Sequence, residues 1–262
     1  MSLVDHDHPP PRGWLPLSPC AVACLPAEDT QPRAGRVRQL GRWLGVFALV
    51  LAAAFHPPAL RRVPRILGVR VVSRGTLGAG ELIVPNHISW LDVLVLLSHT
   101  GAAPLSKHEV AGWPVLGRVA RSFGTVFVDR TRPRALPDTV ATLTWVLRAG
   151  RSVLVFPEGT TWCGAGVGPF RRAAFQAAID SGARIRPVSL RYSTRSASFI
   201  GEDTLWASLS RVIALRELTI EVTALPAIEP DRSRRRLALA AERAVRAELG
   251  QEHDQEPVGA LA

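Results

Sequence analysis

A histidine and an aspartate stand close together in the stretch 85–92, Pro-Asn-His-Ile-Ser-Trp-Leu-Asp, and their spacing suits acid–base chemistry. The stretch follows a short apolar run, which is typical of a buried strand. Ser89, with Asp92 three residues later, resembles a capping box and predicts a helix start. His87 is therefore expected in the turn before this helix, where it can fold back onto Asp92. A carboxylate on one imidazole nitrogen fixes the tautomer and leaves the other nitrogen free to take a proton from a hydroxyl.

A structural interpretation of the same stretch is that Asp92 caps the helix while His87 lies on the surface. Two later stretches favour a catalytic role for His87 and Asp92 instead. The first, 124–130, is Gly-Thr-Val-Phe-Val-Asp-Arg, and the second, 155–160, is Val-Phe-Pro-Glu-Gly-Thr. Each consists of a strand-like apolar run followed by polar residues. In parallel sheets, functional groups gather at the carboxyl ends of strands, so all three stretches fall where a site is expected.

Strand-like and helix-like segments alternate along the chain, which predicts an α/β fold with a mostly parallel central sheet flanked by helices. Strands are expected at 70–73, 82–84, 103–106, 125–128, 152–156, 184–192 and 218–223, and helices at 90–98, 113–122, 133–149, 173–181 and 231–249. Pro187 has no N–H to donate and should mark a strand start, a bulge or an edge. The order of the strands in the sheet does not follow from the pattern.

In their order and spacing, these stretches resemble the glycerolipid acyltransferase family that includes lysophosphatidic acid acyltransferase. The first block of that family is Asn-His, four residues and Asp, here 86–92. Its second block ends in an arginine, here Arg130, its third is Phe-Pro-Glu-Gly-Thr, here 156–160, and its fourth centres on a proline, here Pro187. The resemblance covers about residues 71 to 222, and the combination is more specific than any single block.

The resemblance implies transfer of an acyl chain from acyl-CoA or acyl carrier protein to a lysolipid hydroxyl, first of all that of 1-acyl-sn-glycerol-3-phosphate, to give phosphatidic acid. No further cofactor and no metal in the site are implied. His87 would be the general base and Asp92 its partner. The substrate-binding residues would be Asn86, Ser89, Lys107, Arg130, Glu158, Gly159, Thr160 and Pro187.

Two of these roles also follow from chemistry. Arg130 is planar and always charged, which suits a phosphate head group, although a salt bridge with Asp129 or a neighbour is the structural alternative. Backbone N–H groups in the turn 158–160 could hold the oxyanion of a tetrahedral intermediate.

The chain departs from the family pattern after Thr160. Thr161 resembles the subset that acylates lyso-ornithine lipid or other lysolipids, and Ala173 stands where glycine is common. These departures leave the acceptor open, with lyso-ornithine lipid as the alternative. A third possibility is an inactive relative that binds lipid or acts as a scaffold. The intact His87 and Asp92, together with Arg130 and Glu158, argue against inactivity.

The 262-residue chain carries a formal net charge of +10, and almost all of its basic residues are arginines, with Lys107 the single lysine. Such a surface suits phosphates, in nucleic acid or in anionic lipid. The chain shows no nucleic-acid-binding motif, so the expected partners are an anionic membrane surface and the two substrates, without nucleic acid.

The chain divides by composition into a Pro-rich tail (1–32), a basic and apolar membrane-associating helical segment (33–66), a catalytic domain (67–225), and a basic helix with a tail (226–262). The apolar run 43–55 is shorter than the about 20 residues that span a bilayer. It is flanked by Arg33, Arg36, Arg38, Arg42, Arg61, Arg62 and Arg65. This pattern predicts an interfacial helix in one leaflet and a peripheral, monotopic protein on the cytoplasmic face of the cell membrane. A helix packed on the domain is the alternative, and the two can coexist.

The 3 cysteines do not form a disulfide framework. His6, His8, Cys20 and Cys24 could supply four zinc ligands, but their spacing matches no zinc finger, so no metal site is predicted and the tail is expected to be flexible or docked. Cys163 is interpreted as a small, partly buried thiol rather than an acyl-carrying nucleophile.

Overall fold

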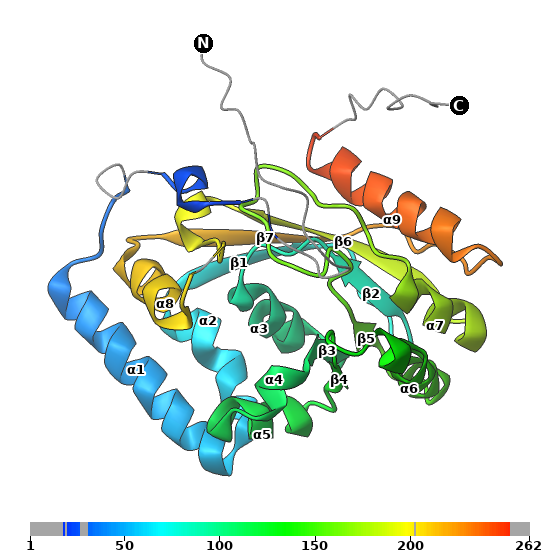
Figure 1. Ribbon diagram of the computed structural model, residues 1–262. Helices are drawn as coiled ribbons and strands as arrows, with labels where there is room; N and C mark the ends of the chain where they lie inside the picture. The colour runs from blue at the N-terminus through cyan, green and yellow to red at the C-terminus, as the bar shows by residue number, and fades with distance from the viewer. Residues whose placement is uncertain (1–17, 19, 27–30, 202, 252–262) are drawn as a thin grey trace.

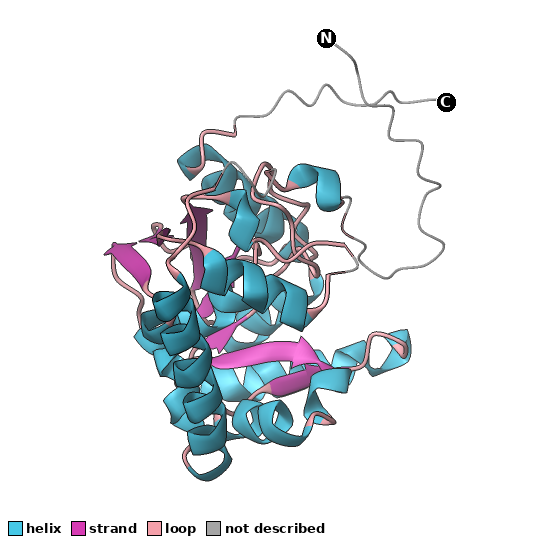
Figure 2. Ribbon diagram, turned by 90° about the vertical axis from the view of Figure 1, so that its left-hand side faces the viewer, coloured by secondary structure: helices cyan, strands magenta, loops and turns pink. Residues whose placement is uncertain are grey.

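A seven-stranded sheet with the order β1-β7-β6-β2-β5-β3-β4 forms the centre of the molecule, and helices cover both of its faces (Figures 1 and 2). The structure is a computed structural model that describes residues 18, 20–26, 31–201 and 203–251. All neighbouring strands are parallel except β6 and β7, which are antiparallel. The strands are β1 (Val69–Arg74), β2 (Leu82–Pro85), β3 (Ala103–Lys107), β4 (Val126–Val128), β5 (Val153–Leu154), β6 (Ile185–Tyr192) and β7 (Leu218–Ala224).

The helices agree with the expected alternation, and the predicted fold class is confirmed. They are α1 (Arg36–Phe55), α2 (Val63–Ile66), α3 (Trp90–His99), α4 (His108–Ala111), α5 (Pro114–Ser122), α6 (Leu136–Arg148), α7 (Ala173–Ser181), α8 (Leu205–Ala214) and α9 (Arg234–Glu248). Short 3-10 helices are η1 (Val22–Cys24), η3 (Pro57–Arg62), η4 (Pro133–Ala135) and η5 (Arg195–Ala197). Sequence analysis missed α8, although Thr204 is its N-cap and accepts a hydrogen bond from the Ala207 N–H (3.1 Å).

Two apolar layers lie on opposite faces of the sheet. The side chains of β2 alternate between them, because Ile83 belongs to one layer while Leu82 and Val84 belong to the other. The first layer includes residues of α1, α3, α5 and α8, and the second includes residues of α6, α7 and α9. A strand buried on both faces reads as an uninterrupted apolar run, which explains the sequence 82–84. Helix α9 contributes four buried residues to the second layer and is therefore part of the same core as the predicted catalytic domain.

Pro187 lies in a central strand and not at an edge. It is the third residue of β6 and stands opposite Val84 of β2. On the other side, the pairing of β6 with β7 reaches only to Val188, and the Pro187 carbonyl accepts a hydrogen bond from the Leu225 N–H (3.0 Å). The proline therefore stands near the strand start, as one of the expected positions, at the point where the pairing with β7 ends.

Helix α1 is longer than the predicted apolar run. It has 20 residues and begins at Arg36, so by length and composition alone it could cross a membrane. The prediction that the segment is too short was wrong because the helix extends through the basic residues before Trp43. However, α1 is docked on the domain: Arg42 and Val46 are buried, and the Arg42 guanidinium donates hydrogen bonds to the carbonyls of Ile213 (2.8 Å) and Leu215 (2.6 Å).

A buried carboxylate, Glu81, ties the turn before β2 to β6. It is 1% exposed and receives two hydrogen bonds from Arg186, at 2.9 and 2.6 Å, and one from the Gly78 N–H at 3.0 Å. Arg184, which is 49% exposed, lies 3.1 Å away. Burial raises the pKa of Glu81, but the hydrogen bonds from Arg186 and Gly78 outweigh burial, so the pKa lies below its ordinary value.

We expect Arg186→Ala to lower the free energy of unfolding by about 3–5 kcal/mol at pH 7, because it leaves a buried charge without its partner. Arg184→Ala is the matched control and should cost less than about 1 kcal/mol, since the side chain of Arg184 is 49% exposed and Glu81 keeps its hydrogen bonds from Arg186. Chemical denaturation measures both. A pKa lowered in the folded state contributes stability that is lost as the pH falls from the ordinary value of 4.5 through the lowered pKa. The difference in the free energy of unfolding between wild type and Arg186→Ala should therefore become smaller in acid. A difference that grows in acid would contradict the lowered pKa of Glu81.

Candidate active site

The imidazole of His87 lies against the carboxylate of Asp92, as the sequence predicted. His87 Nδ1 is 2.9 Å from Asp92 Oδ2, and the side chain of His87 is 17% exposed while that of Asp92 is fully buried. Ser89 is the N-cap of α3 and forms a capping box with Asp92, so local capping chemistry brings the two residues together. The carboxylate accepts the Nδ1 proton, which leaves Nε2 as the nitrogen that can act as a base.

Asp92 is the centre of a network of four hydrogen-bond donors. Oδ2 also accepts the backbone N–H groups of Ile88 (2.6 Å) and Ser89 (2.8 Å). Oδ1 accepts the hydroxyl of Tyr192 (2.5 Å) from the end of β6. Burial and the Asp92 charge raise the pKa of Tyr192, so its hydroxyl stays protonated and remains a donor. With three donors on Oδ2 and one on Oδ1, the carboxylate is held in one orientation.

Glu158 holds the turn that carries His87. One carboxylate oxygen accepts the His87 N–H (2.7 Å) and the other accepts the Gly168 N–H (2.7 Å). The side chain is 3% exposed, and this burial raises the pKa of Glu158 well above its ordinary value. The resemblance placed Glu158 among the substrate-binding residues, but in the structure both of its oxygens are engaged with the backbone. Its geometry is that of a positioning residue.

Asn86, Ser89 and Pro187, which were also expected to bind substrate, are buried and bonded within the fold. The Asn86 amide bridges β2 to β6, donating to the Leu190 carbonyl (3.0 Å) and accepting from the Leu190 N–H (2.7 Å). Ser89 caps α3, and Pro187 lies inside β6. These residues fix the strand ends around His87, so their role in this structure is to position the site.

Arg130 follows β4 and reaches the turn after β5. Its Nη1 donates to the Gly159 carbonyl (2.6 Å), whereas Asp129 accepts hydrogen bonds from Thr131 and pairs with Arg132 (3.4 Å). The salt-bridge alternative with Asp129 therefore does not describe Arg130. Burial lowers the pKa of Arg130, which means that its charge is partly desolvated. Because β2, β5, β3 and β4 are parallel neighbours, the carboxyl ends of all four strands meet at one edge of the sheet.

The remaining predicted residues lie at the same edge. Lys107 ends β3 opposite Val128 and is exposed. Gly159 has φ +76°, a conformation that favours glycine, and its N–H bonds back to the Phe156 carbonyl (3.1 Å). Thr160 follows in the turn and is partly buried. Arg130 and the 158–160 turn are thus linked to the turn of His87 by hydrogen bonds, while Lys107 lies at the same end of the sheet, two strands away from β2.

Two residues of the site were missed by sequence reasoning. Tyr192 is 100 residues from Asp92, and its only sequence signal is that it is the single tyrosine of the chain. The ring of Phe156, which lies in the third block, stacks on His87 with ring centroids 3.9 Å apart. The ring covers one face of the imidazole and limits its rotation.

We expect Tyr192→Phe to lower kcat about tenfold or more with little change in KM, because a hydrogen bond to a charged group is worth about 1.5–3 kcal/mol and this one holds Asp92. The pH–rate profile should shift as well, since the loss of a donor changes the basicity of the His87–Asp92 pair. Steady-state kinetics over pH measures both. Tyr192→Phe kinetics that match the wild type at every pH would contradict the positioning role.

Comparison with known proteins identifies the family of this chain. The acyltransferase family profile matches residues 62–191. A lyso-ornithine lipid O-acyltransferase of Rhodobacter capsulatus is 36% identical over 215 residues, which cover 76% of this chain and 76% of that protein. The chain belongs to this acyltransferase family. The 1-acyl-sn-glycerol-3-phosphate acyltransferase of Neisseria gonorrhoeae is 33% identical over 165 residues, or 61% of this chain, and the match spans 65% of the length of that relative.

A solved structure shows that the chain shares its fold with a known protein. The crystal structure of the 1-acyl-sn-glycerophosphate acyltransferase PlsC from Thermotoga maritima superposes with a TM-score of 0.62, covering 82% of this chain and 94% of that chain. The two sequences are 18% identical, so the likeness concerns the fold. It confirms the expected α/β architecture with a mostly parallel sheet.

Proposed function

We propose that this chain transfers a fatty acyl group from a thioester, acyl-CoA or acyl carrier protein, to the hydroxyl of a lysolipid at a membrane surface. The observation that carries the proposal is the 2.9 Å contact between His87 Nδ1 and the buried Asp92 carboxylate. This pair has the geometry of a general base for a hydroxyl, and family membership supports acyl transfer as its reaction. It also argues against an inactive relative, because the network around Asp92 is complete.

The reaction follows from the positions of these groups. His87 Nε2 takes the proton of the acceptor hydroxyl while its oxygen attacks the thioester carbonyl carbon. The resulting oxyanion would be held by backbone N–H groups of the 158–160 turn. The Gly159 N–H is engaged with Phe156, so the proposed donors are the N–H groups of Glu158 and Thr160. The carbon–sulfur bond then breaks, the imidazolium returns its proton to the thiolate, and the lipid ester and free thiol leave.

The His87→Ala variant tests the function itself. We expect it to lose about 10²–10⁴-fold in kcat, because it lacks the base, while its thermal unfolding midpoint stays close to that of the wild type. Asp92→Asn should lose activity as well, through the wrong tautomer. The matched control is His99→Ala, an exposed histidine at the far end of α3. Near-wild-type acylation of lysolipids by His87→Ala would refute the proposed general base.

The proposed acceptor is 1-acyl-sn-glycerol-3-phosphate, with the phosphate held by the partly desolvated Arg130. Lyso-ornithine lipid is the second candidate, since the Rhodobacter capsulatus relative, named for that acceptor, matches over the longer stretch of 215 residues. The two acceptors differ in charge: one offers a phosphate and the other an amino-acid head group. Parallel assays with both, using one labelled acyl donor, decide between them.

Arg130→Ala should raise the KM for the acceptor, with a loss in kcat/KM of about thirtyfold or more, because truncating a charged partner in a partly desolvated site costs about 2–5 kcal/mol. The KM for the donor should change little. Arg132→Ala is the control, since the side chain of Arg132 is 80% exposed and pairs with Asp129. An increase confined to the donor KM would reassign Arg130 to the phosphates of the donor.

We also propose that α1 docks the protein on the cytoplasmic face of the cell membrane without crossing it. One face of α1 packs on the domain, and the other presents an exposed apolar stripe made of Val37, Leu40, Leu44, Phe47, Leu51 and Phe55. Trp43 packs against Trp206 of α8 with ring centroids 4.6 Å apart and the ring planes tilted by 33°, and Trp206 is 68% exposed. Five of the seven predicted arginines are exposed; Arg42 is buried and Arg61 lies over the Phe123 ring, so these two serve the fold.

The triple variant Leu44→Gln, Phe47→Gln, Leu51→Gln should reduce binding to anionic vesicles at least about a hundredfold, because each apolar side chain transferred from water contributes about 1.5–3 kcal/mol. Its unfolding midpoint should not fall, since these side chains are 54–63% exposed. Trp145→Gln is the control, because Trp145 is an exposed aromatic on α6, a helix of the opposite face of the sheet. Undiminished co-sedimentation of the triple variant with vesicles would exclude α1 as the docking surface.

A further inference from the structure

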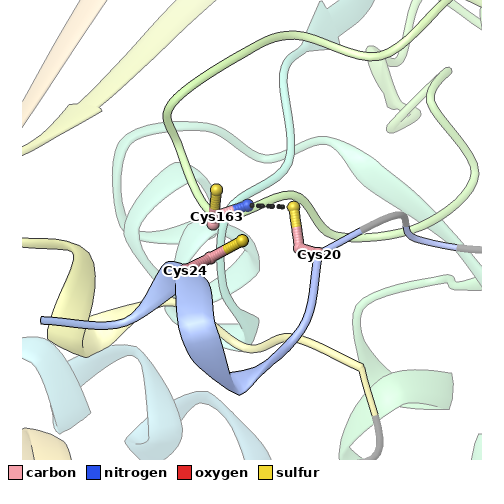
Figure 3. A group of neighbouring side chains, drawn as sticks. All are labelled: Cys20, Cys24 and Cys163. Atoms are coloured by element: carbon pink, nitrogen blue, oxygen red, sulfur yellow. Dashed lines mark hydrogen bonds between the residues drawn. The ribbon is translucent and has the colours of Figure 1, made fainter. Parts of the chain in front are cut away.

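The three cysteines of the chain meet beside the catalytic turn. Cys20 and Cys24 belong to the N-terminal segment around η1, and Cys163 lies in the long loop after β5. Their three sulfur atoms all lie within 4.8 Å of one another. Figure 3 shows the side chains of Cys20 and Cys24 reaching from the N-terminal segment toward the loop that carries Cys163. Residues 140 positions apart in the chain thus form one cluster of thiols.

The cluster is buried and has a backbone donor and a cationic side chain beside it. Cys20 is 7% and Cys163 is 5% exposed, and they pack with Ile200. The Cys163 N–H donates to the Cys20 sulfur (3.2 Å), so the polypeptide already directs a backbone donor at a ligand atom. Arg195, which carries a positive charge, lines the same small pocket as Cys163. A buried group of sulfurs with N–H and cationic partners is the environment that metal-bound thiolates require.

The distances favour a single metal ion over the other uses of neighbouring cysteines. A zinc–sulfur bond is about 2.3 Å, so ligand sulfurs around one tetrahedral zinc lie about 3.8 Å apart. The sulfurs here need to approach by about 1 Å or less to reach that spacing. A disulfide would bring two sulfurs to about 2.0 Å and leave the third thiol without a role. An iron–sulfur cluster needs sulfurs spaced more widely, because each binds a different iron.

We propose that Cys20, Cys24 and Cys163 bind one zinc ion. Three soft thiolates select a thiophilic metal, and three protein ligands with a water molecule make a complete zinc coordination sphere. The three thiols release their protons to solvent on binding, and the complex carries a net charge of −1 that Arg195 offsets. This inference does not depend on acyl transfer.

The zinc site would connect the N-terminal segment to the active site. Trp162, next to Cys163, donates its N–H to the His87 carbonyl (2.8 Å). The Ser198 hydroxyl donates to the Cys163 carbonyl (3.0 Å). The backbone of Ile88 is bonded in turn to the Phe199 N–H (2.9 Å). The loop with Cys163 therefore packs directly against the catalytic turn. Binding of zinc would fix this loop and, with it, the position of His87.

Metal analysis of the full-length protein, purified without a histidine tag, tests the proposal. After loading with Zn²⁺ and dialysis, we expect one zinc per chain by elemental mass spectrometry, and a higher unfolding midpoint with zinc than after chelation. Cobalt loading should produce thiolate-to-cobalt charge-transfer absorption. Cys20→Ser, Cys24→Ser and Cys163→Ser should each lose the metal and the absorption. His108→Ala, which removes an exposed histidine distant in sequence from the cluster, should keep both.

Thiol titration of the unmodified protein keeps the test valid if a cysteine variant fails to fold. All three thiols should react slowly with a disulfide reagent in the zinc-loaded protein and rapidly once a chelator is added. A loaded wild-type protein that retains no zinc would overturn the proposal. A protein mass lower by two hydrogens in the absence of metal would also overturn it, because that mass reveals a disulfide. A loss of zinc in His108→Ala equal to that in the cysteine variants would overturn it as well.

Discussion

The buried carboxylate of Asp92 is the group on which the site depends. A charged carboxylate without solvent is costly by several kcal/mol, and only donors that point at it can offset that cost. Asp92 receives a ring N–H, two backbone N–H groups and the hydroxyl of Tyr192. These donors come from the turn after β2, from the start of α3 and from the end of β6. The carboxylate thus joins three elements and sets the tautomer of His87 at the same time.

The parallel sheet supplies the second condition, which is that the residues of the site meet at one edge. Strands β2, β5, β3 and β4 point the same way, so the turns that follow them lie side by side. The contacts of Glu158 with the His87 N–H and of Arg130 with the Gly159 carbonyl lock these turns to one another. The polar residues of the sequence motifs therefore have two different roles. His87 is partly exposed for chemistry, whereas Asn86, Ser89 and Glu158 are buried and hold it.

Helix α1 combines two demands on one segment. Its inner face is tied to the domain by Arg42, which satisfies carbonyls at the end of α8, and its outer face exposes six large apolar side chains. Exposed apolar stripes of this size mark contact surfaces, because a monomer in water gains nothing from them. The proposed reaction, with an acceptor that lies in a bilayer, would need such a face. The docking of α1 on the core means that this face is rigidly placed relative to the sheet that carries the site.

The sequence by itself determined the features that are local in the chain. The pairing of His87 with Asp92 was predictable because five residues and a capping box suffice to bring them together. The alternation of strands and helices was predictable because apolar periodicity is a local signal. The observed elements confirm the predicted fold class, with small shifts of their boundaries. The helical extent of α1 was misjudged because only its apolar part was counted, although arginines are good helix formers.

The tertiary structure alone decided which distant residues meet. Tyr192 reaches Asp92 across 100 residues, and Cys163 meets Cys20 across 143, because strand order and loop paths set both contacts. The buried role of Glu158 was likewise hidden, since a conspicuous carboxylate in a motif looks the same whether it faces a substrate or a backbone N–H. Local patterns encode periods and turns; they do not encode the order of strands in a sheet, and every one of these contacts depends on that order or on the loops it brings together.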